Sequence, residues 1–336
     1  MTQRNGWGLI GTGRIAEERI LPAVTAFAGN DLVGVVSREG ERAAAFAARF
    51  GARHAYTRYE DLLRDPAVTV VAIHTPNALH AEQAVAAARA GKHVFCDKPM
   101  ATNVADAERI VAECAQAGVT LGVNFHNRFM PCFVDCKRII DSGEIGEVRQ
   151  VTIEASPGAR SEERQGTWRL DPAMAGLGTT MSIGVHIYDI LRYLLSSEIE
   201  TVSALFDTSR GVMEHVNLAT FRFRNGAMAQ VAIHERTPYP HNDLVIYGSQ
   251  GRITGRGVTR SRASGEIEVY VGEEGKARRT QYPVINAHAA CVADFSAALL
   301  EMREPAASGV DGLRSVQVTE AMARSAWEGV HVRLAY

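Results

Sequence analysis

The stretch Trp7-Gly-Leu-Ile-Gly-Thr-Gly-Arg-Ile-Ala16 decides the fold of the first part of the chain. It begins with an apolar run typical of a buried strand and continues as G-x-G-x-x-A. In this motif the first glycine permits a tight turn, the second lets a pyrophosphate approach the backbone, and the small third residue lets a helix pack on the strand. The helix start offers N–H groups to phosphates. We therefore predict a dinucleotide site, with a purely structural glycine turn as the alternative. Its residues are Gly11, Thr12, Gly13, Arg14 and Ile15.

Outward from this motif, β-branched runs alternate with alanine-rich stretches of helical character. This alternation predicts βαβ units and a parallel sheet covered on both faces, that is, an α/β Rossmann domain over residues 1–124. Further strands are expected at Leu32–Val36, Val68–Ile73, His93–Cys96 and Val119–Val123. Helices are expected at about Glu41–Phe50, Ala78–Ala90 and Ala105–Ala117.

The pattern changes near Asn124–Phe129, where we place the boundary to a second domain, residues 125–336. Apolar and polar residues tend to alternate there, and Asn225-Gly226 is a strong hairpin signal. We predict an α+β domain with a large, mostly antiparallel open sheet and one helix at about Thr180–Leu195. The last helical stretch, Gly312–Trp327, can pack back on either domain. The expected strands are Val148–Glu154, Val202–Phe206, Leu218–Phe223, Met228–His234 and Leu244–Tyr247.

Composition narrows the possible functions. A chain of 336 residues with 46% hydrophobic residues is expected to form two globular domains. The 36 basic and 38 acidic residues nearly cancel, which disfavours nucleic acid and anionic membranes as partners. The sequence has neither a long apolar span nor a secretory signal, and its five cysteines form no disulfide framework, so we expect a cytoplasmic protein. Cys132 and Cys136 lack a second ligand pair, and no histidine spacing indicates a metal.

The residues after the second expected strand bear on the choice of cofactor. In a Rossmann domain, an acidic residue at this position binds the ribose 2′-hydroxyl and repels a 2′-phosphate. Here the strand ends in Ser37-Arg38, and Arg42 lies one turn into the next helix. A hydroxyl and two guanidinium groups favour NADP(H) over NAD(H). The alternative is that both arginines belong to a solvated helix face.

Two further polar segments follow expected parallel strands, at the sheet edge where ligands bind. Thr75-Pro76-Asn77-Ala-Leu-His80 follows one strand, and Asp97-Lys98-Pro99 follows the next. Taken alone, Lys98 is equally well explained as a surface lysine.

Together these motifs resemble the glucose–fructose oxidoreductase / inositol dehydrogenase (Gfo/Idh/MocA) family over essentially the whole chain. The resemblance rests on G-x-G-x-x-A, T-P-N-x-x-H, the D-K-P form of the family's usual E-K-P, and Gly184-Val-His186-Ile-Tyr-Asp189. The Trp7-Gly8 start, the pair Ser37 and Arg42 and the pair Trp168-Arg169 look most similar to the 1,5-anhydrofructose reductases of this family.

The resemblance implies an NAD(P)-dependent oxidoreductase that transfers a hydride between a nicotinamide and a sugar, keto-sugar or polyol. It implies that Lys98 anchors the reacting oxygen and helps relay its proton, that Pro99 follows a cis peptide bond, and that His186 is the general acid/base. These roles suit the chemistry, because the oxygen loses or gains a proton as the hydride moves. Expected cofactor contacts include Thr75, Pro76, Asn77, His80, Asp97 and Lys98. Expected substrate contacts are Lys98, Asn124, Trp168, Arg169, Ser182 and His186.

One departure from the family pattern concerns Ser182, where members commonly carry an aspartate four residues before the histidine. A serine hydrogen-bonds a hydroxyl but supplies no carboxylate. This leaves a second hypothesis, a catalytically weakened nucleotide-binding regulatory protein of the same fold. For Asp189, a structural role and a substrate-site role remain equally supported. The resemblance and the open sheet together predict a homodimer or homotetramer.

Overall fold

The computed structural model describes residues 4–158, 167–210, 212–235, 237–259, 265–272 and 277–336. The chain forms two compact units, each assembled from two segments. The first unit comprises Met1–His126 and Asn286–Val316, and the second comprises Asn127–Ile285 and Gln317–Tyr336.

The first unit is built on a six-stranded sheet whose strands all run parallel, in the order β3-β2-β1-β4-β5-β6. The strand order reverses beside β1, which is where doubly wound sheets bind their ligands. The strands are β1 (Asn5–Ile10), β2 (Asn30–Val36), β3 (His54–Tyr56), β4 (Val70–Ile73), β5 (His93–Cys96) and β6 (Leu121–Val123).

Every residue of β1 and β4 is buried, as expected for central strands covered on both faces. Trp7 of β1 meets the rings of Phe95 and Phe295 at centroid distances of 5.8 and 5.9 Å, so one aromatic cluster joins the sheet to a helix from the end of the chain. The helices of this unit are η1 (Ala16–Ile20), α1 (Leu21–Ala26), α2 (Gly40–Phe50), α3 (Tyr59–Arg64), η2 (Asn77–Leu79), α4 (His80–Arg89), α5 (Val104–Gln116) and α9 (Ala287–Glu301).

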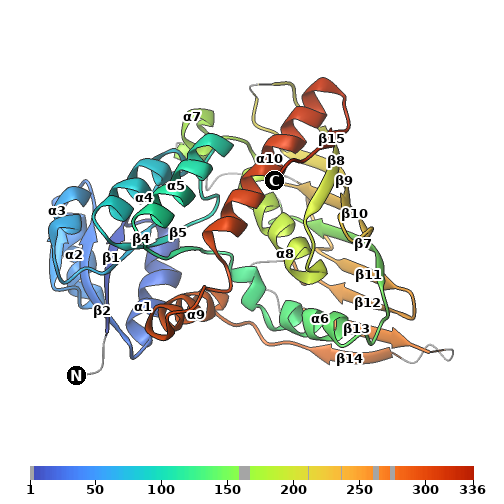
Figure 1. Cartoon of the computed structure of the whole chain (residues 1–336), viewed down its shortest axis with the longest axis horizontal. Helices are drawn as coiled ribbons and strands as arrows, with labels where there is room; N and C mark the ends of the chain where they lie inside the picture. Colours follow the sequence, from blue (N-terminus) through green and yellow to red (C-terminus); the bar gives the residue numbers. More distant parts are fainter. Residues whose placement is uncertain (1–3, 159–166, 211, 236, 260–264, 273–276) are drawn as a thin grey trace. The chain divides into compact units, whose positions relative to one another are not determined.

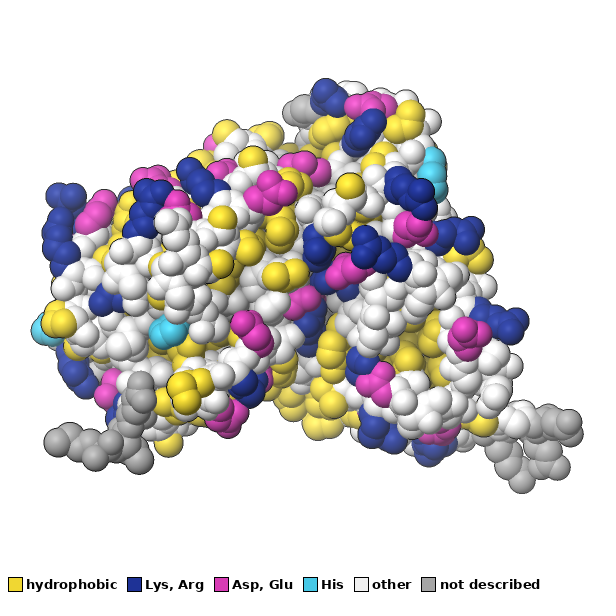
Figure 2. Space-filling view, viewed as in Figure 1, with side chains coloured by type: hydrophobic (Ala, Val, Ile, Leu, Met, Phe, Trp, Pro, Cys, Tyr) yellow, Lys and Arg dark blue, Asp and Glu magenta, His cyan; other side chains and the backbone are white. Residues whose placement is uncertain are grey.

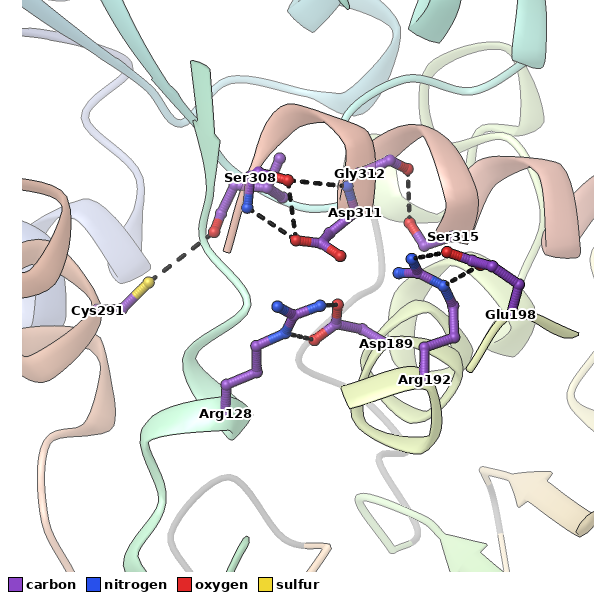
Figure 3. A network of polar contacts seen from close by, with 10 residues as sticks. Arg128, Asp189, Arg192, Glu198, Cys291, Ser308, Asp311, Gly312 and Ser315 are labelled. Carbon is purple, nitrogen blue, oxygen red and sulfur yellow. Dashed lines mark hydrogen bonds and ion pairs between the residues drawn. The ribbon is translucent and has the colours of Figure 1, made fainter. Parts of the chain in front are cut away.

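Helix α10 (Gly309–Glu328) is shared by the two units, with residues up to Val316 in the first. Its start is capped reciprocally: the N–H of Ser308 donates to the Asp311 carboxylate at 2.9 Å, and the N–H of Asp311 donates to the Ser308 hydroxyl at 3.4 Å (Figure 3). These bonds satisfy two donors that a helix start would otherwise leave unpaired.

The second unit is built on a nine-stranded sheet with the order β14-β13-β12-β11-β7-β10-β9-β8-β15. All neighbours are antiparallel except β7 and β10. The strands are β7 (Val148–Ala155), β8 (Ile199–Phe206), β9 (Val216–Phe223), β10 (Met228–His234), β11 (Leu244–Gly248), β12 (Gly251–Arg256), β13 (Glu266–Val271), β14 (Ala277–Gln281) and β15 (Val332–Arg333).

The helices of this unit are η3 (His126–Phe129), α6 (Pro131–Asp141), η4 (Trp168–Leu170), α7 (Pro172–Ala175), η5 (Thr180–Gly184) and α8 (Val185–Leu195). Helices α6 and α8 pack together on one face of the sheet (Figure 1). Buried and exposed residues alternate along β9, as expected for a sheet covered on one face. The other face carries exposed apolar side chains at Leu205, Leu218, Met228 and Tyr247.

The predicted fold class is confirmed: a parallel Rossmann sheet is followed by a mostly antiparallel sheet with helices. The hairpin at Asn225-Gly226 joins β9 to β10, with Gly226 at φ 90°. The helix predicted at Thr180–Leu195 begins with a π-helical turn, η5, and continues as α8. The elements that were not predicted include helices α3, α6 and α9 and strands β3, β12, β13, β14 and β15.

Two surface properties bear on possible partners. Acidic and basic side chains are interspersed on the face shown in Figure 2. Among the described residues, no helix combines the length and apolar character needed to cross a membrane.

Candidate active site

The glycine loop has the geometry that the dinucleotide motif requires. Gly11 adopts φ 102°, and a Cβ there would lie 2.5 Å from the carbonyl oxygen of His74, so only glycine fits. A Cβ at Gly13 would meet no atom within 4 Å, which leaves room for a ligand to approach its backbone. Helical hydrogen bonding begins with the N–H of Glu17 donating to Gly13, so the preceding N–H groups face outward as a phosphate cradle.

One of the three residues predicted to decide between NADP(H) and NAD(H), Arg42, contacts this loop, which the sequence did not indicate. Ser37 is buried at the carboxyl end of β2, and Arg38 is exposed. The Arg42 guanidinium donates to the Thr12 hydroxyl at 2.9 Å and also to the Thr12 carbonyl oxygen. A permanent positive charge therefore lies against the glycine loop, where it favours an anionic ligand.

The segment after β4 is held by His80, which is almost fully buried. Its Nδ1 lies 2.9 Å from the Pro99 carbonyl oxygen, and its Nε2 lies 2.9 Å from the Thr75 carbonyl oxygen. The imidazole thus links the segments that follow β4 and β5. Burial lowers the pKa of His80, while the charge of Asp97 and the two carbonyl contacts act in the opposite direction. Asn77 is buried beside this histidine's helix.

Asp97 and Lys98 follow β5, and the Lys98–Pro99 peptide bond is cis, as the resemblance implied. The Asp97 carboxylate lies 3.4 Å from Nδ1 of the buried His74 and accepts the Lys98 backbone N–H at 3.0 Å. Burial alone would raise the pKa of Asp97, but His74 and the Lys98 ammonium hold this pKa well below its usual range. The carboxylate is therefore ionised at neutral pH.

Sequence reasoning missed the partner of Asn124. The side chain of Asn124 is fully buried: its Nδ2 donates to Asp97 at 3.1 Å, and its Oδ1 lies 3.1 Å from Nδ1 of His288. The His288 ring stacks on that of His126, with centroids 3.7 Å apart. His288 lies 164 residues beyond Asn124, so no local pattern could have indicated this contact.

In the second unit, a buried carboxylate holds the start of the helix that carries His186. Glu214 accepts the backbone N–H of Gly178 at 2.9 Å and that of Thr180 at 2.7 Å. A Cβ at Gly178 would lie 2.0 Å from the Glu214 carbonyl oxygen, so glycine is required for this close approach. Ser182 and His186 follow on the same helix, both half-buried.

Asp189, one turn beyond His186, forms a buried bidentate ion pair with Arg128 (Figure 3). Nε and one terminal nitrogen of Arg128 donate to the two carboxylate oxygens at 2.9 and 2.6 Å. The Asp189 carboxylate is fully buried, and the pair ties α8 to the segment before α6. This contact supports the structural role for Asp189.

Trp168 and Arg169 lie in η4, with the guanidinium 4.5 Å from the indole centroid.

The chain leaves β7 at Ser156, whose backbone N–H donates to Oδ1 of the buried Asn242 at 2.7 Å. Cys132 and Cys136 are buried, and burial raises the pKa of the Cys132 thiol to about 12. The described residues include no group of three or more potential metal ligands.

Several of the predicted residues share one edge of the first sheet. Gly11, Ser37, Asp97 and Asn124 follow the carboxyl ends of β1, β2, β5 and β6. His186 belongs to the second unit.

A Rossmann domain with a glycine-rich phosphate cradle, followed by an open-sheet α+β domain, defines a class of two-domain dinucleotide-dependent oxidoreductases. Residues 6–125 match the family model described as an oxidoreductase family with an NAD-binding Rossmann fold, and residues 133–254 match the GFO/IDH/MocA C-terminal domain. The chain belongs to the Gfo/Idh/MocA family of oxidoreductases.

Individual relatives agree with this assignment. The chain is 32% identical to the 1,5-anhydro-D-fructose reductase of Ensifer adhaerens, over 97% of both proteins. It is 27% identical to D-xylose 1-dehydrogenase (NADP(+)) 2 of Haloferax volcanii, over 98% of this chain and 99% of the relative. The crystal structure of an aldose-aldose oxidoreductase from Caulobacter crescentus, complexed with glycerol, superposes with a TM-score of 0.89 at 29% identity, covering 99% of this chain and 100% of that one. The protein is an NAD(P)-dependent oxidoreductase acting on CH–OH or C=O groups.

Proposed function

We propose that the protein transfers a hydride between NADP(H) and a sugar, keto-sugar or polyol, with Lys98 and His186 acting on the reacting oxygen. The observation that carries this proposal is the position of Lys98, two residues after the end of β5, on the same sheet edge as the glycine loop. The cradle at Gly11 and Gly13 fits a dinucleotide, because one glycine is needed for the turn and the other leaves its backbone open.

In the oxidative direction, the substrate carbon loses a hydride and its hydroxyl loses a proton. The bound nicotinamide supplies the hydride acceptor. The Lys98 ammonium donates a hydrogen bond to the substrate oxygen and stabilises its developing negative charge. The His186 imidazole takes up the hydroxyl proton, and in the reductive direction it returns the proton to the carbonyl oxygen. The charge of Lys98 in turn helps to hold the pKa of the neighbouring Asp97 well below its usual range.

The preference for NADP(H) over NAD(H) rests on Ser37, Arg38 and Arg42. A strand end without a carboxylate does not repel a 2′-phosphate, and the Arg42 guanidinium lies against the glycine loop. One relative, from Haloferax volcanii, carries NADP(+) in its name. Thr75, Pro76, Asn77 and His80 form the proposed wall beside the nicotinamide, and Arg14 and Ile15 open the helix that receives the pyrophosphate.

Asn124, Trp168, Arg169 and Ser182 complete the proposed substrate site. For Asn124 the proposed role is indirect, because both ends of its amide bond to protein groups. A keto-sugar reductase activity is the first to test, given the relative from Ensifer adhaerens.

The test is a steady-state assay of NADPH oxidation with keto-sugars and of NADP reduction with polyols. The Lys98→Ala variant is expected to lower kcat by about 100-fold or more while the dissociation constant for NADPH changes little. The matched control is Lys92→Ala, which removes a lysine at the opposite edge of the sheet, where it caps carbonyl groups of Asp65 and Val68. Unchanged turnover in Lys98→Ala would refute the role assigned to this lysine.

The second candidate, a regulatory protein that binds the nucleotide without turnover, is supported by Ser182 in place of the family's usual aspartate. Binding of NADPH without turnover across a broad sugar panel would favour it. Ser182→Asp would then be expected to restore turnover.

We also propose that the protein is cytoplasmic, with residues 1–124 as the cofactor domain and residues 125–336 as the substrate domain, of which the segment Asn286–Val316 packs with the first unit. We propose a homodimer or homotetramer formed through the sheet face that exposes Leu205, Leu218 and Met228. Multi-angle light scattering of the wild type and of Leu218→Lys tests this assembly: a monomeric wild type would refute it.

A further inference from the structure

We propose that His288 is a ligand-binding residue whose imidazole is held as the neutral tautomer protonated on Nδ1, so that Nε2 accepts a hydrogen bond from an N–H or O–H group of a bound ligand. Asp97 and Asn124 are the positioning residues that set this tautomer. The proposal rests on the proposed function, because its ligand is the nicotinamide cofactor or the carbohydrate.

The first step is the orientation of the Asn124 amide. Asp97 is ionised and therefore offers only acceptors. The group of Asn124 that lies 3.1 Å from the Asp97 carboxylate must be its NH₂, because two acceptors would repel each other. The backbone holds the two residues together: the N–H of Asn124 donates to Cys96 at 2.9 Å, and the N–H of Asp97 donates to Ile73 at 2.9 Å.

The second step is the tautomer of His288. With its NH₂ group on Asp97, Asn124 presents its carbonyl oxygen to Nδ1 of His288, at 3.1 Å. An amide oxygen can only accept, so Nδ1 must carry a proton. Burial, the neighbouring His126 and the Arg19 guanidinium hold the pKa of His288 well below its ordinary value, although Asp97 opposes them. A neutral ring with its proton on Nδ1 has a bare Nε2, which is an acceptor.

The third step is the rigidity of the ring. Nδ1 is fixed by Asn124, and one face of the imidazole stacks on His126 with an interplanar angle of 25°. Within the described part of the chain, no residue donates a hydrogen bond to Nε2. His288 therefore holds a preorganised acceptor beside the polar residues that follow β5 and β6. A hydroxyl or a carboxamide NH₂ group matches this acceptor, whereas a carboxylate or phosphate does not.

The same sheet provides an internal control at its other end. His93 begins β5, and its Nδ1 accepts the backbone N–H of Thr120 at 3.0 Å. Burial lowers the pKa of His93, so this ring is also neutral, but its proton must lie on Nε2. The structure therefore assigns opposite tautomers to His93 and His288.

The first experiment reads these tautomers directly, without turnover. Long-range ¹H–¹⁵N correlation spectra of the full chain labelled with ¹⁵N-histidine, at pH 7.5, are expected to show His288 protonated on Nδ1 and His93 protonated on Nε2. Signals are assigned by their loss in His288→Phe and His93→Phe. In Asn124→Ala, His288 is expected to lose its single tautomer while His93 keeps its own. An Nε2-protonated His288 in the wild type would overturn the proposal.

The second experiment measures what the acceptor does. His288→Phe keeps a ring on His126 but removes both nitrogens, and it is expected to weaken ligand binding by about three- to tenfold, the loss of one neutral hydrogen bond. A rise in the NADPH dissociation constant identifies the cofactor as the donor, and a rise in KM alone identifies the carbohydrate. His93→Phe is the matched control and is expected to change neither.

Binding constants that stay within twofold in His288→Phe would overturn the proposed role. A wild-type chain that binds no nicotinamide cofactor would refute the proposed function instead. That failure is recognisable separately, because the tautomer spectra are recorded without any ligand.

Discussion

Acidification is expected to destabilise the first unit through His126. Burial is the main cause that lowers the pKa of this histidine, from an ordinary value of 6.5 to about 4. The Lys98 ammonium and the Arg19 guanidinium act in the same direction, Asp97 opposes them, and the neutral His288 ring covers one face. Below pH 6.5 the unfolded chain therefore takes up a proton that the folded chain does not bind, and stability falls with pH.

The size of the effect follows from the two pKa values. A pKa difference of about 2.5 corresponds to about 3 kcal/mol, which is fully lost once the pH is below about 4. Between pH 7 and pH 5, about 2 kcal/mol of this stability is lost. The loss is absent in a variant that has no titratable group at this position.

The assay is urea denaturation at pH 7 and pH 5, followed by tryptophan fluorescence, to which Trp7, buried in the first unit, contributes. The wild type is expected to lose about 2 kcal/mol more than His126→Gln over this interval. Replacing the exposed His241 with Gln controls for the removal of one histidine. Equal pH dependence in the wild type and His126→Gln, or a ring that titrates near pH 6.5 by NMR, would refute the reasoning.

Three further predictions concern other contacts. Asp189→Ala removes the carboxylate that pairs with the buried Arg128 guanidinium and is expected to cost about 3–5 kcal/mol in urea denaturation. Adding Arg128→Met should recover part of this loss, and no recovery would contradict the ion-pair account. Glu214→Gln keeps the shape but removes the charged acceptor, and is expected to cost about 1–3 kcal/mol and to lower kcat more than it raises KM. An unaltered melting temperature would argue against this anchoring role. Arg42→Ala is expected to raise KM for NADPH about tenfold or more with a smaller effect for NADH, and equal effects would count against 2′-phosphate recognition.

The sequence predicted helices and strands well where their apolar residues form a clear local pattern, either a continuous run or a regular alternation. The apolar strands of the first sheet, the alternating strands β7–β11 and the hairpin at Asn225-Gly226 were all indicated by local patterns. Helix α9 was missed because apolar residues lie on most of its sides, which weakens the helical periodicity. Strand β14 was missed because its residues Ala277–Gln281 are mostly polar and exposed.

In the candidate site, the residues that the sequence indicated stand in local motifs, and the contacts that it missed join distant residues. The glycine loop, Asp97 and Lys98 stand in motifs whose residues are close in sequence, so spacing alone indicated them. The contact of Asn124 with His288 and that of Gly178 with Glu214 join residues 164 and 36 positions apart. Such contacts depend on tertiary packing, and a single sequence carries no spacing that reports them.

Two buried side chains fix the ends of the segment that connects β7 to α8, and this arrangement has a consequence for substrate preference in proteins of this kind. Asn242 fixes the connection where it leaves the sheet at Ser156, and Glu214 fixes it where it enters the helix at Gly178. Exchanges between these two points are therefore expected to leave both anchoring hydrogen bonds in place. A library randomised only between residues 157 and 177 should change which sugars are accepted while most members remain folded, so new specificities can arise without exchanging His186, the proposed acid/base.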